Sequence, residues 1–290
     1  MRTKVILALA LALVWCAGSA YAQQPPLGLT FVSDYHVRPG KEVDFMQLVK
    51  TVGEPVRDKL MAEGVIMAWG IDTPLMRAPG QPNYSIWYAV ANLNGVQQVQ
   101  DAIRAQLRKL ADEEKKAADD ARKKGGKGAK TTAERIQEVY ELDKTKDWFF
   151  RDVLANFSSA PPPAGLLSYT WIETDRVLPG KGPEYRQLFE KYDKPILDKL
   201  LADGTLGAYG LSVEEVRTTD SFTHFLWVSV PNLAAADKIN AAFEAAFSKR
   251  SDEERAQIRQ HYFSLVDAPA NRSFVLRAVI FKVGGPPPKK

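Results

Sequence analysis

The chain contains one stretch twice. Residues Val37–Gly70 read VRPGKEVDFMQLVKTVGEPVRDKLMAEGVIMAWG, and residues Val177–Gly210 read VLPGKGPEYRQLFEKYDKPILDKLLADGTLGAYG. The two align without a gap at an offset of 140 residues, and 14 of the 34 positions are identical. Average residue frequencies would give about two identities by chance. The register then continues to Trp87 and Trp227. Two copies of one unit predict one fold used twice and packed about a pseudo-twofold axis.

Each copy predicts the same order of elements from its hydrophobic periodicity and its turn residues. In the first copy we expect strands at 29–37, 65–71, 84–91 and 148–157, and helices at 42–63, from near Asn94 and from near Thr132. In the second copy we expect strands at 167–177, 206–212, 222–230 and 274–283, with helices before Gly204 and at 233–249 and 251–262. Toward the end of each copy, aligned positions differ by 126 residues instead of 140, because the first copy has about 14 extra residues within 112–130.

The order β-α-β-β-α-β is the split βαβ arrangement, in which both helices cover one face of an antiparallel sheet. The other face of each sheet needs a partner, and the tandem copy supplies it. The predicted fold class is therefore α+β, with two tandem ferredoxin-like βαββαβ repeats forming an intrachain pseudo-dimeric α+β barrel. Pro55 and Pro195 lie inside the first helix of the two copies and predict a kink there.

The predicted organisation has five segments. These are a signal peptide at 1–22, a first repeat at 27–157, a proline-rich linker at 158–165, a second repeat at 166–284 and a tail at 285–290. The leader has a basic start, an apolar run at Val5–Trp15 and the small residues Ala20 and Ala22 before the expected cleavage point. Eleven apolar residues are too few to span a bilayer, which takes about 20. We therefore expect a periplasmic or secreted protein.

The mature chain has no cysteine, since Cys16 leaves with the leader. Its core rather than disulfide bonds must therefore hold it together. Loss of Arg2 and Lys4 lowers the formal net charge from +4 to +2, which is too small to indicate nucleic acid or an anionic membrane as a partner. We expect no membrane span, no nucleic acid and a monomer, because each sheet finds its partner within the chain.

Both copies continue from the first strand into a similar motif, PGKEVDF at Pro39–Phe45 and PGKGPEY at Pro179–Tyr185. A strand followed by Pro-Gly-Lys, then an acidic residue and an aromatic residue in the first helical turn, resembles the dimeric α+β barrel superfamily. That superfamily includes NIPSNAP-like proteins and antibiotic-biosynthesis-type monooxygenases. The resemblance implies the barrel topology and, as one possible activity, an oxygen- or haem-using enzyme. It transfers no catalytic residue, since no position here matches a catalytic motif.

Charged residues on the predicted strands are the first candidates for a site. Asp34 and His36 are two residues apart, so they point to one face as an acid-base or ligand-orienting couple. Arg151 and Arg277 occupy equivalent points of the two last strands. They either pair with carboxylates of the first strands (Asp34 in copy one, Glu173 and Asp175 in copy two) or face a pocket and hold an anionic ligand.

The tryptophans of the mature chain all fall on predicted strands, where they pack a core or line a flat hydrophobic site. Trp69 aligns with Tyr209 in the second copy. The candidate ligand-binding residues are Asp34, His36, Trp69, Trp87, Arg151, Glu173, Tyr209, Trp227 and Arg277.

The chain lacks the GxSxG, Rossmann-glycine and histidine-pair motifs of common catalytic and metal sites. The leading hypothesis is an exported binding protein for a small apolar or aromatic ligand between helices and sheet. The alternatives are a cofactor-independent or haem-using oxidoreductase and a non-catalytic structural or interaction protein. We expect no metal and no cofactor. His261 is the sole histidine on a predicted helix, and its counterpart is Arg135, so we predict no stoichiometric haem binding.

Overall fold

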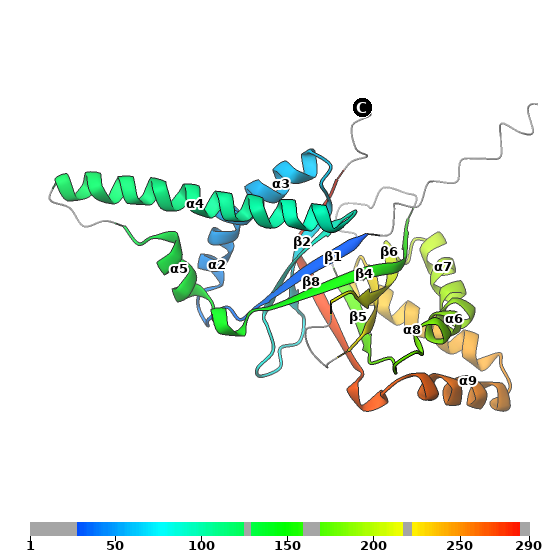
Figure 1. The fold of residues 1–290 in the computed structure, drawn as a ribbon. Coiled ribbons are helices and arrows are strands. Elements are labelled where there is room, and N and C mark those ends of the chain that lie inside the picture. The colour runs from blue at the N-terminus through cyan, green and yellow to red at the C-terminus, as the bar shows by residue number, and fades with distance from the viewer. Residues whose placement is uncertain (1–27, 125–128, 159–168, 217–221, 285–290) are drawn as a thin grey trace, which may run out of the picture.

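The computed structural model describes residues 28–124, 129–158, 169–216 and 222–284 (Figure 1). The expected signal peptide, nearly all of the linker and the tail lie outside the described residues. In the first half the elements are β1 (Leu29–Tyr35), α2 (Glu42–Leu48), η1 (Val49–Gly53), α3 (Glu54–Ala62), β2 (Ile66–Pro74), β3 (Tyr84–Val90), α4 (Leu93–Lys123), α5 (Thr132–Val139), η2 (Leu142–Lys144) and β4 (Lys146–Phe157). In the second half they are β5 (Tyr169–Asp175), α6 (Gly182–Tyr192), α7 (Lys194–Ala202), β6 (Ala208–Glu214), β7 (His224–Val230), α8 (Leu233–Ser248), α9 (Asp252–Leu265), η3 (Ala268–Ala270) and β8 (Arg272–Val283).

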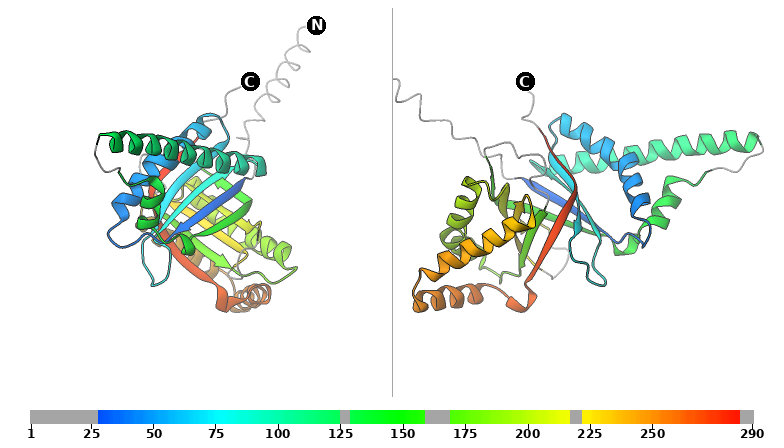
Figure 2. Two further views of the ribbon diagram at one scale, coloured as in Figure 1. Left: turned by 60° about the vertical axis from the view of Figure 1, so that its left-hand side comes forward. Right: turned by 180° about the vertical axis from the view of Figure 1, so that it is seen from behind.

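The eight strands form one closed antiparallel barrel in the order β1-β3-β2-β8-β5-β7-β6-β4. Each half contributes four adjacent strands, and the last strand of each half pairs with the second strand of the other half. The helices lie outside the barrel, those of the two halves on opposite sides (Figures 1 and 2). The predicted α+β pseudo-dimeric barrel is therefore confirmed. Within the described ranges, no helix is both long and apolar enough to cross a membrane.

The first helix of each copy is broken, as the two prolines indicated. In the first half the single helix expected at 42–63 is divided into α2 and α3 by the π-helical segment η1, directly before Pro55. In the second half α6 ends at Tyr192 and α7 begins one residue before Pro195. Gly64 and Gly204 follow these helices with φ of 75° and 78°, a left-handed conformation that glycine adopts without strain.

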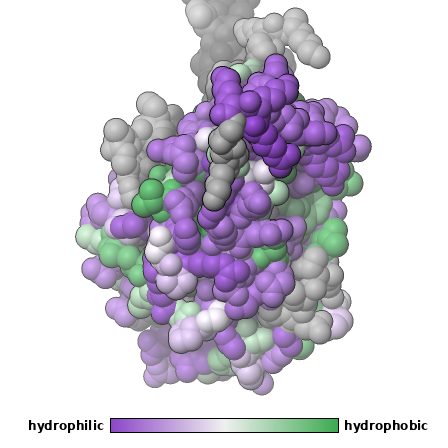
Figure 3. All heavy atoms as spheres, turned by 90° about the vertical axis from the view of Figure 1, so that its left-hand side faces the viewer, coloured by the Kyte–Doolittle hydropathy of each residue, from purple (hydrophilic) through white to green (hydrophobic). Residues whose placement is uncertain are grey.

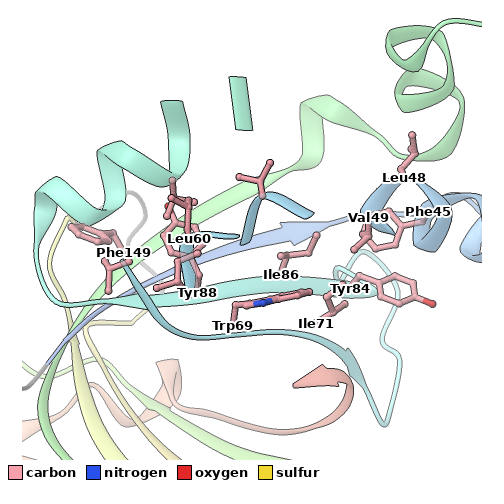
Figure 4. Close-up of a cluster of buried hydrophobic side chains, with 14 of the residues drawn as sticks. Phe45, Leu48, Val49, Leu60, Trp69, Ile71, Tyr84, Ile86, Tyr88 and Phe149 are labelled. Atoms are coloured by element: carbon pink, nitrogen blue, oxygen red, sulfur yellow. The ribbon is translucent and has the colours of Figure 1, made fainter. Parts of the chain in front are cut away.

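Two hydrophobic cores lie between the helices and the outer face of the barrel, one in each half. In the first core, Figure 4 shows the side chains of Leu60, Ile86 and Tyr88 between the helices and strands β2 and β3. Trp69 lies in the same layer and is fully buried. The strand residues that alternate with these point into the barrel, and they include Trp87 and Trp148.

The helix α4 is 31 residues long, whereas its counterpart α8 has 16. At the offset of 140 residues the end of α8 corresponds to residue 108, so the extra helical length covers 109–123, which overlaps most of the predicted stretch 112–130 without matching its start. Glu114 of α4 accepts hydrogen bonds from the backbone and side chain of Thr132, which starts α5, and pairs with Arg135 at 3.2 Å. Asn92, two residues before the expected Asn94, caps α4. The end of the molecule toward which α4 projects is mostly hydrophilic (Figure 3).

Candidate functional site

A cavity of about 420 Å³ lies between the helices and the sheet of the first half. Strands β1 and β3 form its floor, and residues of α3 and α4 form its roof. Residue alternation explains the floor, since Phe31, Tyr35, Ile86 and Tyr88 all occupy strand positions that face the helices. The volume falls within the range of small-molecule sites, roughly 300–1,000 Å³.

The cavity walls are mainly aromatic and aliphatic. The rings of Phe31 and Tyr88 stack with centroids 5.3 Å apart, and Tyr35 meets Tyr140 edge to face at 5.0 Å. Aliphatic side chains of α4, Val99 and Ile103, complete the apolar lining. Such rings offer flat surfaces against which an aromatic or apolar molecule can pack.

Among the described residues, Arg57 is the one cation that lines this cavity. It extends from α3 and only 8% of it is exposed. Its guanidinium carbon lies 5.6 Å from the centre of the Trp69 ring. The buried Nε has no hydrogen-bond acceptor, and the guanidinium makes no ion pair within the described residues. Burial lowers the pKa of Arg57, although Tyr35 and Tyr88 oppose this shift. Arginine nevertheless stays charged in proteins.

Polar groups gather elsewhere along the same cavity. Ser33 donates to Asp147 at 2.6 Å and shares a hydrogen bond with Tyr35, so these three side chains form a short chain. Gln100 donates to the Tyr88 hydroxyl at 3.3 Å. Burial raises the pKa of Tyr35 and raises that of Tyr88 to about 12, so both hydroxyls keep their protons at neutral pH.

The second half carries different residues at the positions equivalent to Arg57 and Gly53. Leu197, fully buried, replaces Arg57, and Asp193 replaces Gly53 of the segment before it. Burial, with a contribution from Glu173, raises the pKa of Asp193 to about 7. Asp175, the counterpart of Tyr35, accepts hydrogen bonds from Tyr185 at 2.5 Å and Tyr262 at 2.7 Å. The guanidinium of Arg57 thus has no counterpart at the equivalent position of the second half.

Trp69 and Tyr209 lie at equivalent positions, each hydrogen-bonded to an aspartate on the neighbouring helix. The Trp69 indole donates to Asp58 at 3.1 Å, and the Tyr209 hydroxyl donates to Asp198. The last strand of the opposite half also reaches each cluster, through Lys282 to Asp58 at 2.7 Å and through Asn156 to Tyr209 at 2.6 Å. Both aromatic residues therefore help to join the halves.

Three further candidates lie on the face turned into the barrel. Asp34 accepts hydrogen bonds from Ser85 at 2.5 Å and from Trp148 at 2.7 Å, and burial raises its pKa despite them. Trp87 donates to Asp72 at 2.8 Å, and burial raises the pKa of Asp72 to about 7.

The third of these candidates, Trp227, donates to Ser212 at 3.2 Å, and Ser212 donates to Asp152 at 2.5 Å. His36 lies just beyond β1, and no hydrogen bond joins it to Asp34. The two do interact electrostatically, which lowers the pKa of Asp34 slightly against the effect of burial.

The expected ion pairs with strand-one carboxylates are not formed. Arg151 instead pairs with Glu215 at 2.6 Å, across the seam between β4 and β6. The reason is that Arg151 lies opposite Leu29 at the start of β1, five residues from Asp34. Arg277 is exposed and lies opposite Tyr169, and it makes no ion pair within the described ranges. Glu173 is exposed on the face of β5 that also carries Asp175, and partial desolvation together with the charge of Asp175 raises its pKa.

None of the nine sequence candidates lines the cavity of the first half. Arg57 is not among the candidates, because the candidate charges lie on predicted strands whereas Arg57 lies on a helix. A signal was available in the repeat itself, since Arg57 stands in a helical apolar stripe where the second copy has Leu197.

His261 lies on α9 with its side chain 49% exposed, and its Nε2 is 4.0 Å from a carboxylate oxygen of Glu184. In the part of the chain that the structure describes, no group of three or more histidine, cysteine or acidic side chains is placed to hold a metal ion. That the protein binds no stoichiometric haem stays a prediction.

No protein-family model and no curated protein matches the chain. Solved structures share its fold: the chain has the dimeric α+β barrel, with both units in one polypeptide. A proposed monooxygenase from Fusobacterium nucleatum subsp. nucleatum aligns with a TM-score of 0.57 at 12% identity, over 92% of this chain and 100% of that one. A proposed monooxygenase from Lactobacillus acidophilus aligns with a TM-score of 0.54 at 9% identity, over 89% and 97%. These likenesses concern the fold alone.

Proposed function

We propose that this chain is an exported binding protein that takes one small, largely apolar or aromatic molecule into the cavity of its first half. The observation that carries the proposal is the cavity itself, which has stacked aromatic walls and an aliphatic roof. A well-formed apolar pocket with a few convergent polar groups is the default ligand site of an uncharacterised fold. Export rests on the pattern of the first 22 residues.

The fold shared with proposed monooxygenases supplies no reaction for this chain, because one fold serves many unrelated functions. The oxidoreductase alternative has its own test. Haem is titrated into the protein while the Soret band is followed, in the wild type and in His261→Ala. A saturable one-to-one spectrum that is lost in the variant would favour the haem enzyme over the binding protein.

Native mass spectrometry of the protein purified from its own host tests the binding function directly. We expect one small molecule per chain. Ile103→Trp places a large ring on α4 at the cavity wall and should abolish the adduct. Leu93→Trp adds the same ring at an exposed position of α4 and serves as the control, which should keep the adduct. An adduct that survives Ile103→Trp would show that the ligand binds elsewhere.

A further inference from the structure

Arg57 places a positive charge in this cavity, and among the described residues no acidic group forms an ion pair with it. Charged side chains this deeply buried are normally paired, since an isolated ion in a poorly polar environment is costly. The acidic group that lines the same cavity, Asp147, is not among the groups that shift the pKa of Arg57, and both it and Asp58 have other partners. Asp58 accepts from Trp69 at 3.1 Å and from Lys282 at 2.7 Å, and Asp147 accepts from Ser33 at 2.6 Å.

The local backbone leaves room for this arrangement. A Cβ atom on Gly53 would overlap Nη1 of Arg57, so glycine at this position lets the guanidinium lie against the helix. Gly53 ends the π-helical segment η1, and such segments are frequent at functional sites. The second copy has neither this glycine nor this arginine, since it carries Asp193 and Leu197 at the two positions.

We propose that the ligand of this cavity carries an acidic oxygen group, such as a carboxylate or a phenolate, which pairs with Arg57 while its apolar body packs against the aromatic walls. The proposal rests on the proposed function, because it names the chemical class of the ligand of that site. A guanidinium presents a planar fork of donors that matches a carboxylate.

One phenol group reinforces the choice of an anion. Tyr88 lines the same cavity, and its hydroxyl acts as a hydrogen-bond donor as well as an acceptor. The Tyr88 oxygen accepts from Gln100, which leaves its own proton for another acceptor. Tyr35 is already engaged with Ser33, whose own proton goes to Asp147. The site thus offers a cation and one neutral donor to an oxygen anion. Because Arg57 has no counterpart in the second half, the stoichiometry should be one anion per chain.

The test compares two probes of the same shape, 2-naphthoate and 2-naphthylmethanol, by calorimetric titration of the full mature chain at pH 7. We expect one site per chain and at least tenfold tighter binding of the acid. Arg57→Leu, which copies the second half, should remove the preference while binding of the alcohol is kept. Arg151→Leu removes an exposed arginine that does not line the cavity, and it should leave both affinities unchanged.

The outcomes separate the two proposals. If the wild type binds both probes equally, or if Arg57→Leu keeps the preference for the acid, the cavity takes apolar molecules but the acidic-ligand inference is wrong. If neither probe binds, the proposed function fails and the inference falls with it. Arg57→Lys keeps the charge without the planar fork, and its affinity for the acid should lie between those of the wild type and Arg57→Leu.

Discussion

Gly53 and Arg57 lie one helical turn apart, and a Cβ atom on Gly53 would overlap Nη1 of Arg57. The glycine therefore determines where the guanidinium can lie. The clash would involve the far end of a flexible side chain, so Arg57 can move away from a methyl group at little cost in stability. A substitution at Gly53 should therefore move the guanidinium without removing its charge.

We predict that Gly53→Ala weakens binding of 2-naphthoate at least tenfold and leaves binding of 2-naphthylmethanol unchanged. The free energy of unfolding should change by less than about 1 kcal/mol, because alanine gains helix propensity while Arg57 shifts. Calorimetric titration and denaturant unfolding measure the two effects. Unchanged affinity for the acid would mean that Arg57 binds no ligand from its observed position.

Arg57→Leu should stabilise the ligand-free protein by about 1–3 kcal/mol. The substitution removes a buried charge whose Nε has no hydrogen-bond partner, which should stabilise the protein. It also removes the cation–π contact with Trp69, and this loss opposes the gain by about 0.5–2 kcal/mol. Urea unfolding of the ligand-free protein is the measurement, with Arg151→Leu as the control for loss of a surface arginine. A clear loss of stability would show that the protein itself compensates the charge of Arg57.

Asp72 should make the stability depend on pH. Burial raises its pKa to about 7, above that of an unfolded aspartate, so the native state binds more protons between about pH 4 and 7. The stability it contributes is fully present below the unfolded pKa and is lost as the pH rises through about 7. Between pH 5 and 8 the free energy of unfolding of Asp72→Asn should therefore fall by about 2–3 kcal/mol less than that of the wild type.

The matched control is Asp152→Asn. Burial raises the pKa of Asp152 to about 6, which is lower than that of Asp72, so its effect over the same interval should be roughly half as large. The measurement is unfolding by denaturant at pH 5 and at pH 8, carried out on the wild type and on both variants. The assignment to Asp72 is wrong if its asparagine variant follows the pH dependence of the wild type.

The ion pair between Arg151 and Glu215 should contribute little. The two side chains are 48% and 31% exposed, and exposed pairs are worth about 0.2–1 kcal/mol. Arg151→Met should therefore lower the free energy of unfolding by no more than about 1 kcal/mol, and a double-mutant cycle with Glu215→Gln should give a coupling of the same size. A loss above about 3 kcal/mol would indicate a role in closing the seam that the exposure does not explain.

The repeat allowed the barrel to be predicted, because an alignment of two copies reveals both the order of strands and the position of the extra residues in α4. The kink was predictable from Pro55 and Pro195, whereas the π-helical form of η1 was not. Periodicity reports which face of a helix is buried, and it carries no information on hydrogen-bond spacing along the helix.

The site was not predictable from strand charges, since the partners of Arg151 depend on register. A shift of five residues along β1 separates Arg151 from Asp34, and the sequence does not state which residue of β6 lies across the seam. Positions at which the two copies carry different types of residue say more about the site than charges on single strands do. Arg57 against Leu197 marks a position where one half keeps a charge that packing alone would not require.

Cleavage of the linker at Pro161–Pro163 should leave the two halves associated. Each half contributes its last strand to a seam with the other, and Lys282 of β8 also bonds to Glu54 at 2.8 Å and Asp58 at 2.7 Å on α3. Separation would expose unpaired strand edges on both sheets, which favour re-association or aggregation.

A protease site inserted in place of the three prolines allows this test by sedimentation. The cut protein should sediment like the intact chain, or aggregate after denaturation and refolding, and uncut protein with the same insert is the control. If cleavage gives two folded halves that sediment separately as monomers, the seams do not hold the barrel together.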